Sequence, residues 1–366
     1  MKKLLSLLTV LALVLTLVAC ASKEDTYELA LVTDVGTIDD KSFNQGAWEG
    51  LVKYAEEKNI DYNYYQPTAK TTDEYVAAID LAVKGGAKNV VTPGYLFENA
   101  IYVVQDKYPE VNFIILDGAA HNVVDWDTMA TMDDSDVDFR LEDNVYSIFY
   151  KEQESGFLAG YAAVKDGYTE LGFMGGMAVP AVVRFGYGFV QGADHAAEEM
   201  GVDINVKYHY TGVFWPTDEV QNTASAWYQG GTEVIFAAAG GAGNSVMKAA
   251  EQNDGKAIGV DVDQSAESTT VITSAKKELA ESVYQCLTEI YNETSDFFIA
   301  GESVVMSVNN NGVGLPSDFS RFESFTEAQY QEVIDYLKNP PVELASDAIS
   351  SVADVPVNVA TVEIVE

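Results

Sequence analysis

Acidic and basic side chains follow two neighbouring apolar runs in the C-terminal half of the chain. Asp261 comes directly after Ile258 to Val260, and Lys276 and Lys277 follow a second short run. A carboxylate can accept both hydrogens of a vicinal diol, and a lysine can donate to the same oxygen atoms. The pattern favours a hydroxyl-rich ligand, although a helix cap and two solvated lysines would produce it equally well. The spacing does not separate Lys276 from Lys277.

A polar loop with one aromatic residue follows the first apolar run, which ends at Asp34. Ser42 or Asn44 can cap the helix expected next. Phe43 can either pack on that helix or stack on a flat ligand. Further polar, glycine and aromatic residues stand at the ends of other apolar runs: Asp117, Phe214, Trp215 and Gly240. Together these residues indicate a small polar ligand with a flat ring.

The chain carries no arrangement of residues that is typical of catalysis. Gly-x-Ser-x-Gly, phosphate-binding and dinucleotide-binding glycine motifs are absent, and no cysteine is placed as a nucleophile. Three histidines are too few and too scattered for a zinc site. The calcium-binding loop of nucleoside hydrolases can be aligned on Asp34, but Val32 and Ile38 then occupy ligand positions. We therefore expect a binding protein with no cofactor and no metal, rather than an enzyme.

Short β-branched runs alternate with longer amphipathic ones along most of the chain. This alternation is typical of parallel sheets with helices on both faces, and ligands bind at the carboxyl ends of strands in such sheets. A length of 366 residues favours two domains. We predict an α/β fold with two doubly wound lobes. The expected strands are residues 29–34, 61–65, 89–92, 112–116, 144–150, 171–174, 205–210, 233–237 and 257–260.

The first twenty residues have the pattern of an export signal. Lys2 and Lys3 precede an apolar run that ends at Cys20, and the run is short and lies at the N-terminus. Its end, Leu17-Val-Ala-Cys20, resembles the lipobox of bacterial lipoproteins. We expect a signal peptide over residues 1–19, a lipid on Cys20 and a tether over 20–26. The second cysteine, Cys286, lies in an apolar-periodic stretch and is expected to be buried without a disulfide partner.

The chain is strongly acidic, with a formal charge of −36. Removal of a signal peptide that carries two lysines and no acid changes this charge to −38. Such a surface repels nucleic acids and phosphorylated nucleotides, and an anionic bilayer does not attract it. We therefore expect no nucleic-acid partner, and contact with the membrane through the lipid alone.

Several of these segments together resemble the basic membrane protein family of bacterial lipoproteins. The matching pieces, in family order, are the lipobox, Asp39-Asp-Lys-Ser-Phe-Asn-Gln45, Gly156-Phe-Leu-Ala-Gly-Tyr161, Phe236-Ala-Ala-Ala-Gly-Gly241, Ile258-Gly-Val-Asp-Val-Asp-Gln264 and Thr273-Ser274 with its lysines. The family consists of nucleoside-binding components of ABC transporters with a type I periplasmic-binding-protein fold. The resemblance implies the same fold and activity here.

Carried over residue by residue, the resemblance implies that Phe43 stacks on a purine base. Phe214 closes the sandwich from the second lobe, with Trp215 as its rival. Asp261 grips the ribose hydroxyls and Lys277 assists, with Lys276 as the alternative. Further ligand contacts are implied at Asp34, Asn44, Asp117 and Gly240. Trp215 and the proline after it depart from the family pattern, which leaves the preferred base open.

The resemblance also implies two lobes that close on the ligand across a three-stranded hinge. We expect the first lobe at residues 27–150 and 265–300 and the second at 151–264 and 301–366, with crossings near 150, 265 and 300. The implied partners are a nucleoside of the adenosine, guanosine or inosine class and an ABC permease. We expect a monomer, held by its lipid on the extracytoplasmic face of the cell membrane, in either a one-membrane or a two-membrane envelope. The alternatives are a binding protein for a sugar or small signal molecule, or a secreted nucleoside hydrolase.

Overall fold

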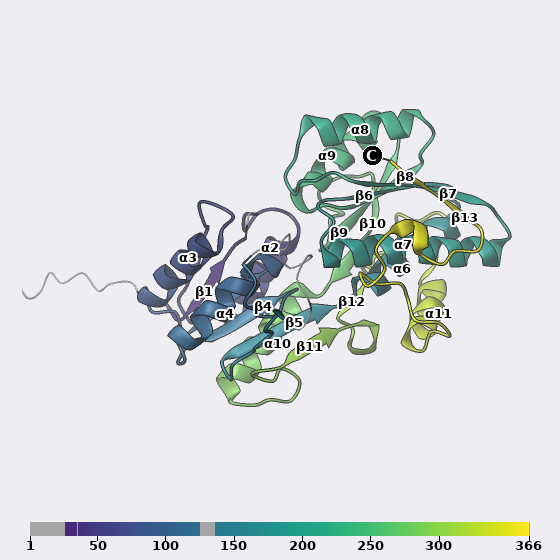
Figure 1. The fold of residues 1–366 in the computed structure, drawn as a ribbon. Helices are drawn as coiled ribbons and strands as arrows, with labels where there is room; N and C mark the ends of the chain where they lie inside the picture. The colour runs from purple at the N-terminus through teal and green to yellow at the C-terminus, as the bar shows by residue number, and fades with distance from the viewer. Residues whose placement is uncertain (1–25, 35, 125–135, 366) are drawn as a thin grey trace, which may run out of the picture.

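The computed structural model describes residues 26–34, 36–124 and 136–365. Figure 1 shows two lobes, each built on a central sheet with helices on both faces. The first sheet has six strands in the order β11-β5-β4-β3-β1-β2, and the second has seven in the order β12-β10-β9-β8-β6-β7-β13. This arrangement confirms the predicted α/β fold with two doubly wound lobes. The expected signal peptide and Cys20 lie outside the described residues.

The strands of the first sheet all pair in parallel. Most are continuous apolar runs, because helices cover both faces of a parallel sheet. In β1, Leu29 and Leu31 pack with α2, whereas Ala30 and Val32 pack with α3 on the other face, as alternation along a strand requires. The elements are β1 (Leu29–Val32), α2 (Phe43–Lys58), β2 (Tyr62–Tyr65), α3 (Thr72–Lys84), β3 (Asn89–Pro93), η1 (Tyr95–Phe97), α4 (Glu98–Lys107), β4 (Asn112–Leu116), β5 (Val145–Tyr150), α10 (Leu279–Asn292) and β11 (Ser303–Met306).

The second sheet is parallel except for the pair β10 and β12. Cys286 of α10, in the other lobe, is buried and free, as expected. In the described residues no helix is both long and apolar enough to cross a bilayer. The elements are α6 (Glu152–Lys165), β6 (Glu170–Gly175), α7 (Pro180–Met200), β7 (Ile204–Tyr210), α8 (Asp218–Gln229), β8 (Val234–Ala238), η3 (Gly240–Ala242), α9 (Gly243–Gln252), β9 (Lys256–Asp261), β10 (Val271–Lys277), η4 (Val308–Asn310), β12 (Val313–Gly314), α11 (Glu327–Lys338), η5 (Val352–Asp354) and β13 (Ala360–Ile364).

Helices α6 and α7 approach each other so closely that only glycine fits at the contact. A Cβ atom at Gly156, Gly160, Gly188 or Gly192 would lie 2.0–2.2 Å from a backbone oxygen of the other helix. Two of these glycines belong to the segment Gly156 to Tyr161 that resembles the basic membrane protein family. Their structural role is therefore packing of the second lobe.

The chain passes between the lobes three times. The crossings lie between β5 and α6, between β10 and α10, and between β11 and β12. The first follows Tyr150, the last residue of β5. The other two come later than the expected 265 and 300, because β10 pairs with β9 of the second sheet and β11 pairs with β5 of the first. An apolar run predicts a strand, but it does not identify the sheet that the strand joins.

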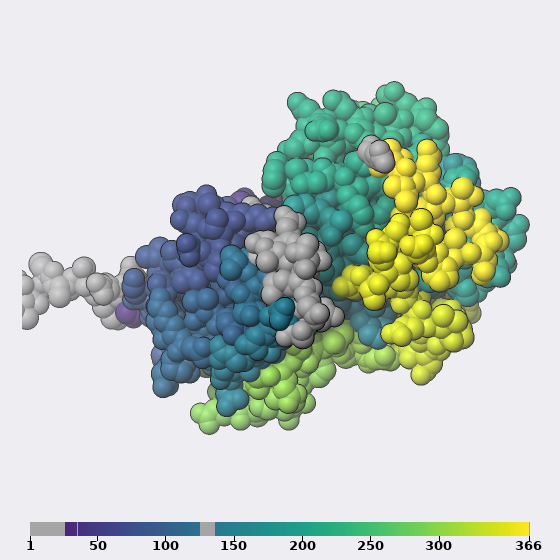
Figure 2. Space-filling model, in the orientation of Figure 1, coloured from purple at the N-terminus to yellow at the C-terminus, as the bar shows by residue number. Residues whose placement is uncertain are grey.

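The C-terminal segment lies over the second lobe, where Figures 1 and 2 show it in yellow. Its last strand, β13, pairs in parallel with β7 at the edge of the sheet. Asp194 of α7, which is 5% exposed, accepts hydrogen bonds from the backbone N–H groups of Asn358, Val359 and Ala360 at 2.8–3.0 Å. One buried carboxylate thus anchors the start of the last strand.

Candidate functional site

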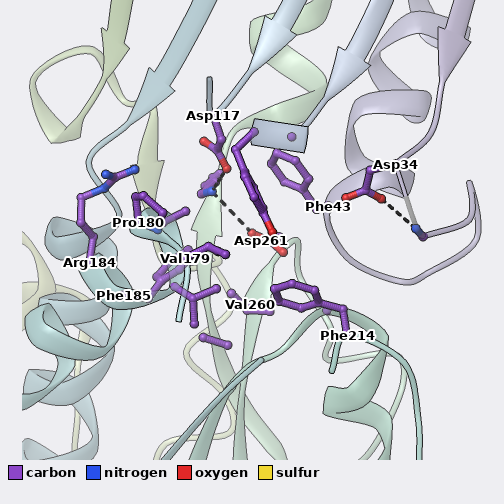
Figure 3. A pocket seen from close by; sticks show the side chains of 18 of the residues that line it. Asp34, Phe43, Asp117, Val179, Pro180, Arg184, Phe185, Phe214, Val260 and Asp261 are labelled. Atoms are coloured by element: carbon purple, nitrogen blue, oxygen red, sulfur yellow. Dashed lines mark hydrogen bonds and ion pairs between the residues drawn. The ribbon is translucent and has the colours of Figure 1, made fainter. Parts of the chain in front are cut away.

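A cavity of about 280 Å³ lies between the lobes and is lined by both of them. Its polar walls stand at the carboxyl ends of strands in both sheets, where ligands bind in this class of fold. All of the sequence-predicted ligand-binding residues except Trp215 line it: Asp34, Phe43, Asn44, Asp117, Phe214, Gly240, Asp261 and Lys277. Figure 3 shows how several of these side chains face the same space.

The loop before α2 is held by a network of side-chain carboxylates. Asp40 accepts hydrogen bonds from the backbone N–H groups of Ser42, Asn44 and Gln45 at 2.9–3.1 Å, so it caps the helix. The side-chain amide of Asn44 donates to Asp34 Oδ1 and to Asp40 Oδ2, both at 2.9 Å. Asp40 was not predicted as a site residue; it lies two residues before the N-cap residue Ser42, whose own side chain makes no capping bond. These bonds fix Asn44 and Asp34 at the cavity wall.

Asp34 keeps one oxygen open. Its Oδ1 accepts from Asn44 and from the N–H of Gly36 at 2.7 Å, whereas Oδ2 receives no hydrogen bond from the described residues and faces the Gly94 backbone. Burial raises the pKa of Asp34 to about 6, and the hydrogen bonds from Gly36 and Asn44 oppose that rise. This carboxylate can therefore accept a hydrogen bond from a ligand at neutral pH.

Two phenylalanine rings line the cavity from opposite lobes. Phe43 is the first residue of α2, and Phe214 follows β7 in the second lobe. Glycines make room for Phe214, because a Cβ atom at Gly176 would lie 2.2 Å from its ring. Trp215 is 53% exposed and does not line the cavity. Of the two predicted rivals, Phe214 is thus the aromatic residue that faces the cavity.

A buried lysine lies among carboxylates at the hinge end of the cavity. Lys277 Nζ is 2.5 Å from Asp117 Oδ2, 2.8 Å from Glu152 Oε1 and 4.0 Å from Asp261 Oδ1. Burial alone would favour the neutral amine, but Asp117 and Glu152 raise the pKa of Lys277 above its ordinary value. Burial also raises the pKa of Asp117, an effect that Lys277 opposes. At neutral pH the lysine is a charged donor.

Lys276 does not share this environment. Its ammonium group pairs with Glu278 at 2.8 Å, and it does not line the cavity. Successive residues of a strand point to opposite faces, so only Lys277 of the two predicted alternatives points into the interior.

Direct hydrogen bonds join the lobes beside the cavity. Ser42 Oγ, fully buried in the first lobe, donates to Asp261 Oδ2 at 2.5 Å. Gln264 Nε2 donates to the carbonyl oxygen of Lys41 at 2.7 Å. Asp261 itself has a positive φ of 66°, an uncommon conformation for a residue with a side chain. The lobes are therefore closed on each other around Asp261.

Sequence reasoning also missed three charged residues that belong to helices near the cavity. Glu98, at the start of α4, accepts from the N–H of Ala119 at 3.0 Å and pairs with His121 Nε2 at 3.1 Å. Burial raises its pKa. Arg184 of α7 lines the cavity, and Glu152 of α6 lies behind Lys277. All three stand in or at the start of helices, so a search of strand ends does not find them.

Two sheets joined by three crossings, with a cavity between them, define a two-lobed substrate-binding protein. The chain belongs to the family described as ABC transporter substrate-binding protein PnrA-like, whose family model matches residues 27–342. This finding confirms the family suggested by the sequence.

Relatives and solved structures agree with this assignment. The ABC transporter nucleoside-binding protein BmpA of Lactococcus lactis is 30% identical over 313 residues, which are 79% of this chain and 81% of the relative. Basic membrane protein B of Borreliella burgdorferi is 28% identical over 302 residues, covering 81% and 82%. A solute-binding protein of an ABC transporter system from Aeropyrum pernix has the same fold, with a TM-score of 0.67, 23% identity and 87% of each chain covered.

Proposed function

We propose that this chain is an extracytoplasmic lipoprotein that binds a nucleoside, preferably a purine nucleoside, and delivers it to an ABC permease. The observation that carries the proposal is the cavity with Phe43 and Phe214 on opposite lobes and Asp117, Asp261 and Lys277 at its hinge end. A flat base fits between two rings, and a sugar fits among carboxylates and an ammonium group. Stacking contributes about 1–3 kcal/mol for each aromatic partner.

The hinge end of the cavity offers both donors and acceptors to a ribose. Asp117 Oδ1 is buried and has no hydrogen-bond partner among the described residues. A buried acceptor without a partner is costly, and a ligand hydroxyl would satisfy it. Asp261 supplies a second carboxylate, and Lys277 supplies N–H donors. This combination suits the vicinal hydroxyls of a ribonucleoside.

The charge of the cavity favours an uncharged ligand over a phosphorylated one. In the described part of the chain its lining includes the carboxylates of Asp34, Asp40, Glu98, Asp117, Asp261 and Asp347, against the cations of Arg184 and Lys277. Both cations are already paired with carboxylates. A phosphate would find no free positive charge here, whereas the hydroxyl groups of a nucleoside need none.

Membrane attachment and delivery complete the proposal. The lipobox at Cys20 supports a lipid anchor on the extracytoplasmic face of the cell membrane, and the family description supports an ABC permease as the partner. The nucleoside-binding relative from Lactococcus lactis supports a nucleoside as the cargo. We propose that the protein acts as a monomer and that it holds its ligand without chemical change.

Calorimetry with a panel of ligands tests the proposal. We expect binding heat with adenosine, guanosine or inosine, weaker heat with cytidine and uridine, and little with ribose or free bases. No heat with any nucleoside would refute the proposal. Ribose binding as strong as nucleoside binding would favour a sugar-binding protein instead. Release of hypoxanthine from inosine during long incubation with calcium, followed by chromatography, would indicate a hydrolase.

A further inference from the structure

A buried glutamate lies directly behind Lys277 and pairs with Arg184, which lines the cavity. Glu152, the first residue of α6, is 0% exposed. Its Oε1 is 2.8 Å from Lys277 Nζ, and its Oε2 is 2.5 Å from Nε of Arg184. Arg184 also pairs with Asp347 at 3.0 Å. Lys277 is thus linked through Glu152 to a second cation and to the C-terminal segment.

This pair restricts where the lysine ammonium can point. A lysine side chain has a flexible four-carbon stem, and its ammonium group carries three N–H donors. A single partner therefore leaves the direction of the ammonium group poorly defined. Asp117 accepts a hydrogen bond from the ammonium group, and Glu152 attracts it as a second anion 2.8 Å away, so the two carboxylates together restrict its direction. The rings of Phe43, Tyr150 and Phe185 enclose it, with centroids 4.9–5.3 Å from Nζ.

Arg184 helps to keep Glu152 ionised, which is the form that attracts the lysine ammonium group. Burial alone favours the neutral carboxyl, but Arg184 and Lys277 hold the pKa of Glu152 below its ordinary value. An ionised Glu152 accepts a hydrogen bond from Arg184 at Oε2 and forms an ion pair with Lys277 at Oε1. A neutral side chain of the same shape could accept from one of them only, and its own hydrogen would face the other.

The position of the pair connects it to the hinge. Glu152 comes two residues after the end of β5, and Lys277 is the last residue of β10. Their contact therefore joins the first and second crossings between the lobes, while Asp117 reaches Lys277 from the first lobe. The direction of the ammonium group depends on how these segments are placed relative to one another.

We propose that Glu152, supported by Arg184, is a positioning residue that directs Lys277 toward the sugar hydroxyls and so sets the preference for ribonucleosides over deoxygenated ones. The proposal rests on the nucleoside-binding function proposed above and assigns a determinant of specificity outside the direct contacts. Glu152 does not line the cavity, so its effect on specificity must pass through Lys277.

The test compares two ligands in two matched variants. Calorimetry is carried out with guanosine and with 2′,3′-dideoxyguanosine on the wild type, Glu152→Gln and Glu154→Gln. Glu154 is the control because it is a second buried glutamate in the first turn of α6, 4% exposed, which accepts from the backbone of Val308 at 2.7 Å and does not contact Lys277. Should guanosine not bind the wild type, the best nucleoside of the panel and its dideoxy form replace the pair.

We expect Glu152→Gln to weaken guanosine binding about tenfold or more, equivalent to about 1.4 kcal/mol, and to change dideoxyguanosine binding much less. The ratio of the two affinities therefore falls in Glu152→Gln and is unchanged in Glu154→Gln. Equal losses for both ligands, or an unchanged ratio, would overturn the proposal while leaving nucleoside binding intact.

A second variant covers the case in which Glu152→Gln does not fold. Glu152→Asp keeps the charge but withdraws the carboxylate from Lys277, and we expect an affinity ratio between those of the wild type and Glu152→Gln. A wild-type ratio in Glu152→Asp, with no folded Glu152→Gln, would overturn the proposal. If the wild type binds no nucleoside at all, the proposed function fails first and this inference fails with it.

Discussion

Replacing Asp261 by asparagine is expected to weaken nucleoside binding without lowering the stability of the ligand-free protein. The carboxylate lines the cavity, and its Oδ1 lies 4.0 Å from Lys277, close enough for a ligand hydroxyl to reach both. Hydrogen bonds to a charged group contribute about 1.5–3 kcal/mol. Loss of the charge should therefore weaken binding about 10- to 150-fold.

The same substitution is not expected to destabilise the ligand-free protein, because the ionised Asp261 carboxylate is itself unfavourable to folding. Burial raises the pKa of Asp261, with Lys277 and Ser42 opposing the rise. Because the carboxyl pKa is higher in the folded protein than in the unfolded chain, folding favours the neutral form of Asp261. Stability therefore falls as the pH rises through the folded-state pKa, and the ionised group destabilises the fold at neutral pH. Asparagine removes that cost, and its side-chain oxygen can still accept from Ser42. Lys277 keeps its two closer carboxylates.

Calorimetry with guanosine and thermal unfolding of the ligand-free protein test both parts. Asp263→Asn is the matched control, because Asp263 is exposed, lies outside the cavity lining and accepts only a local bond from the N–H of Ser265 at 3.0 Å. We expect the control to bind like the wild type. A melting temperature several degrees lower in Asp261→Asn, or an unchanged affinity, would refute the reasoning.

Four further changes separate binding from folding. Gly176→Ala places a Cβ atom 2.2 Å from the ring of Phe214, so the ring must move, and calorimetry should show nucleoside affinity about fivefold or more lower. Trp215→Ala should leave affinity within about twofold in the same assay, because Trp215 is exposed and outside the cavity. Asp194→Asn should lower stability by about 1.5–3 kcal/mol in denaturant unfolding, with unchanged affinity, because it weakens the bonds to three backbone N–H groups. Nucleoside affinity should rise from pH 5 to pH 7 as Asp34 ionises around its pKa of about 6 and accepts from the base. Asp34→Asn should reduce that rise in titrations across the range, and the remainder comes from Asp117, whose pKa burial also raises.

Much of the fold could be predicted from periodicity, because the central strands are buried in their sheets and read as continuous apolar runs. The run expected at 112–116 coincides with β4, and that at 89–92 lies within β3. The two later crossings could not be predicted, since the pairing of β10 with β9 and of β11 with β5 depends on which sheet edge is free. An apolar run has the same appearance at either edge.

Some of the cavity residues could likewise be predicted from the sequence, and others could not. Those at strand ends, such as Asp117 and Asp261, could be predicted because a parallel sheet brings its carboxyl ends together. Glu152 and Arg184 stand in helical stretches, where charged residues are ordinarily solvated. Their burial follows from the close packing of α6 on α7 and from the contact of α6 with β10, which no local pattern shows.

The charge of Lys277 is balanced by carboxylates before a ligand binds, and this has a consequence for the proposed transport function. Asp117 and Glu152 already pair with the ammonium group, so a ligand gains a hydrogen bond from it rather than a full ion pair. A phosphate would have to displace one of these buried carboxylates, and leaving a buried charge without its partner costs about 3–5 kcal/mol. A hydroxyl group displaces neither and can donate to the open oxygen of Asp117. The same balance that disfavours anions also limits how tightly a neutral ligand is held, which suits the proposed release of the cargo when the lobes open.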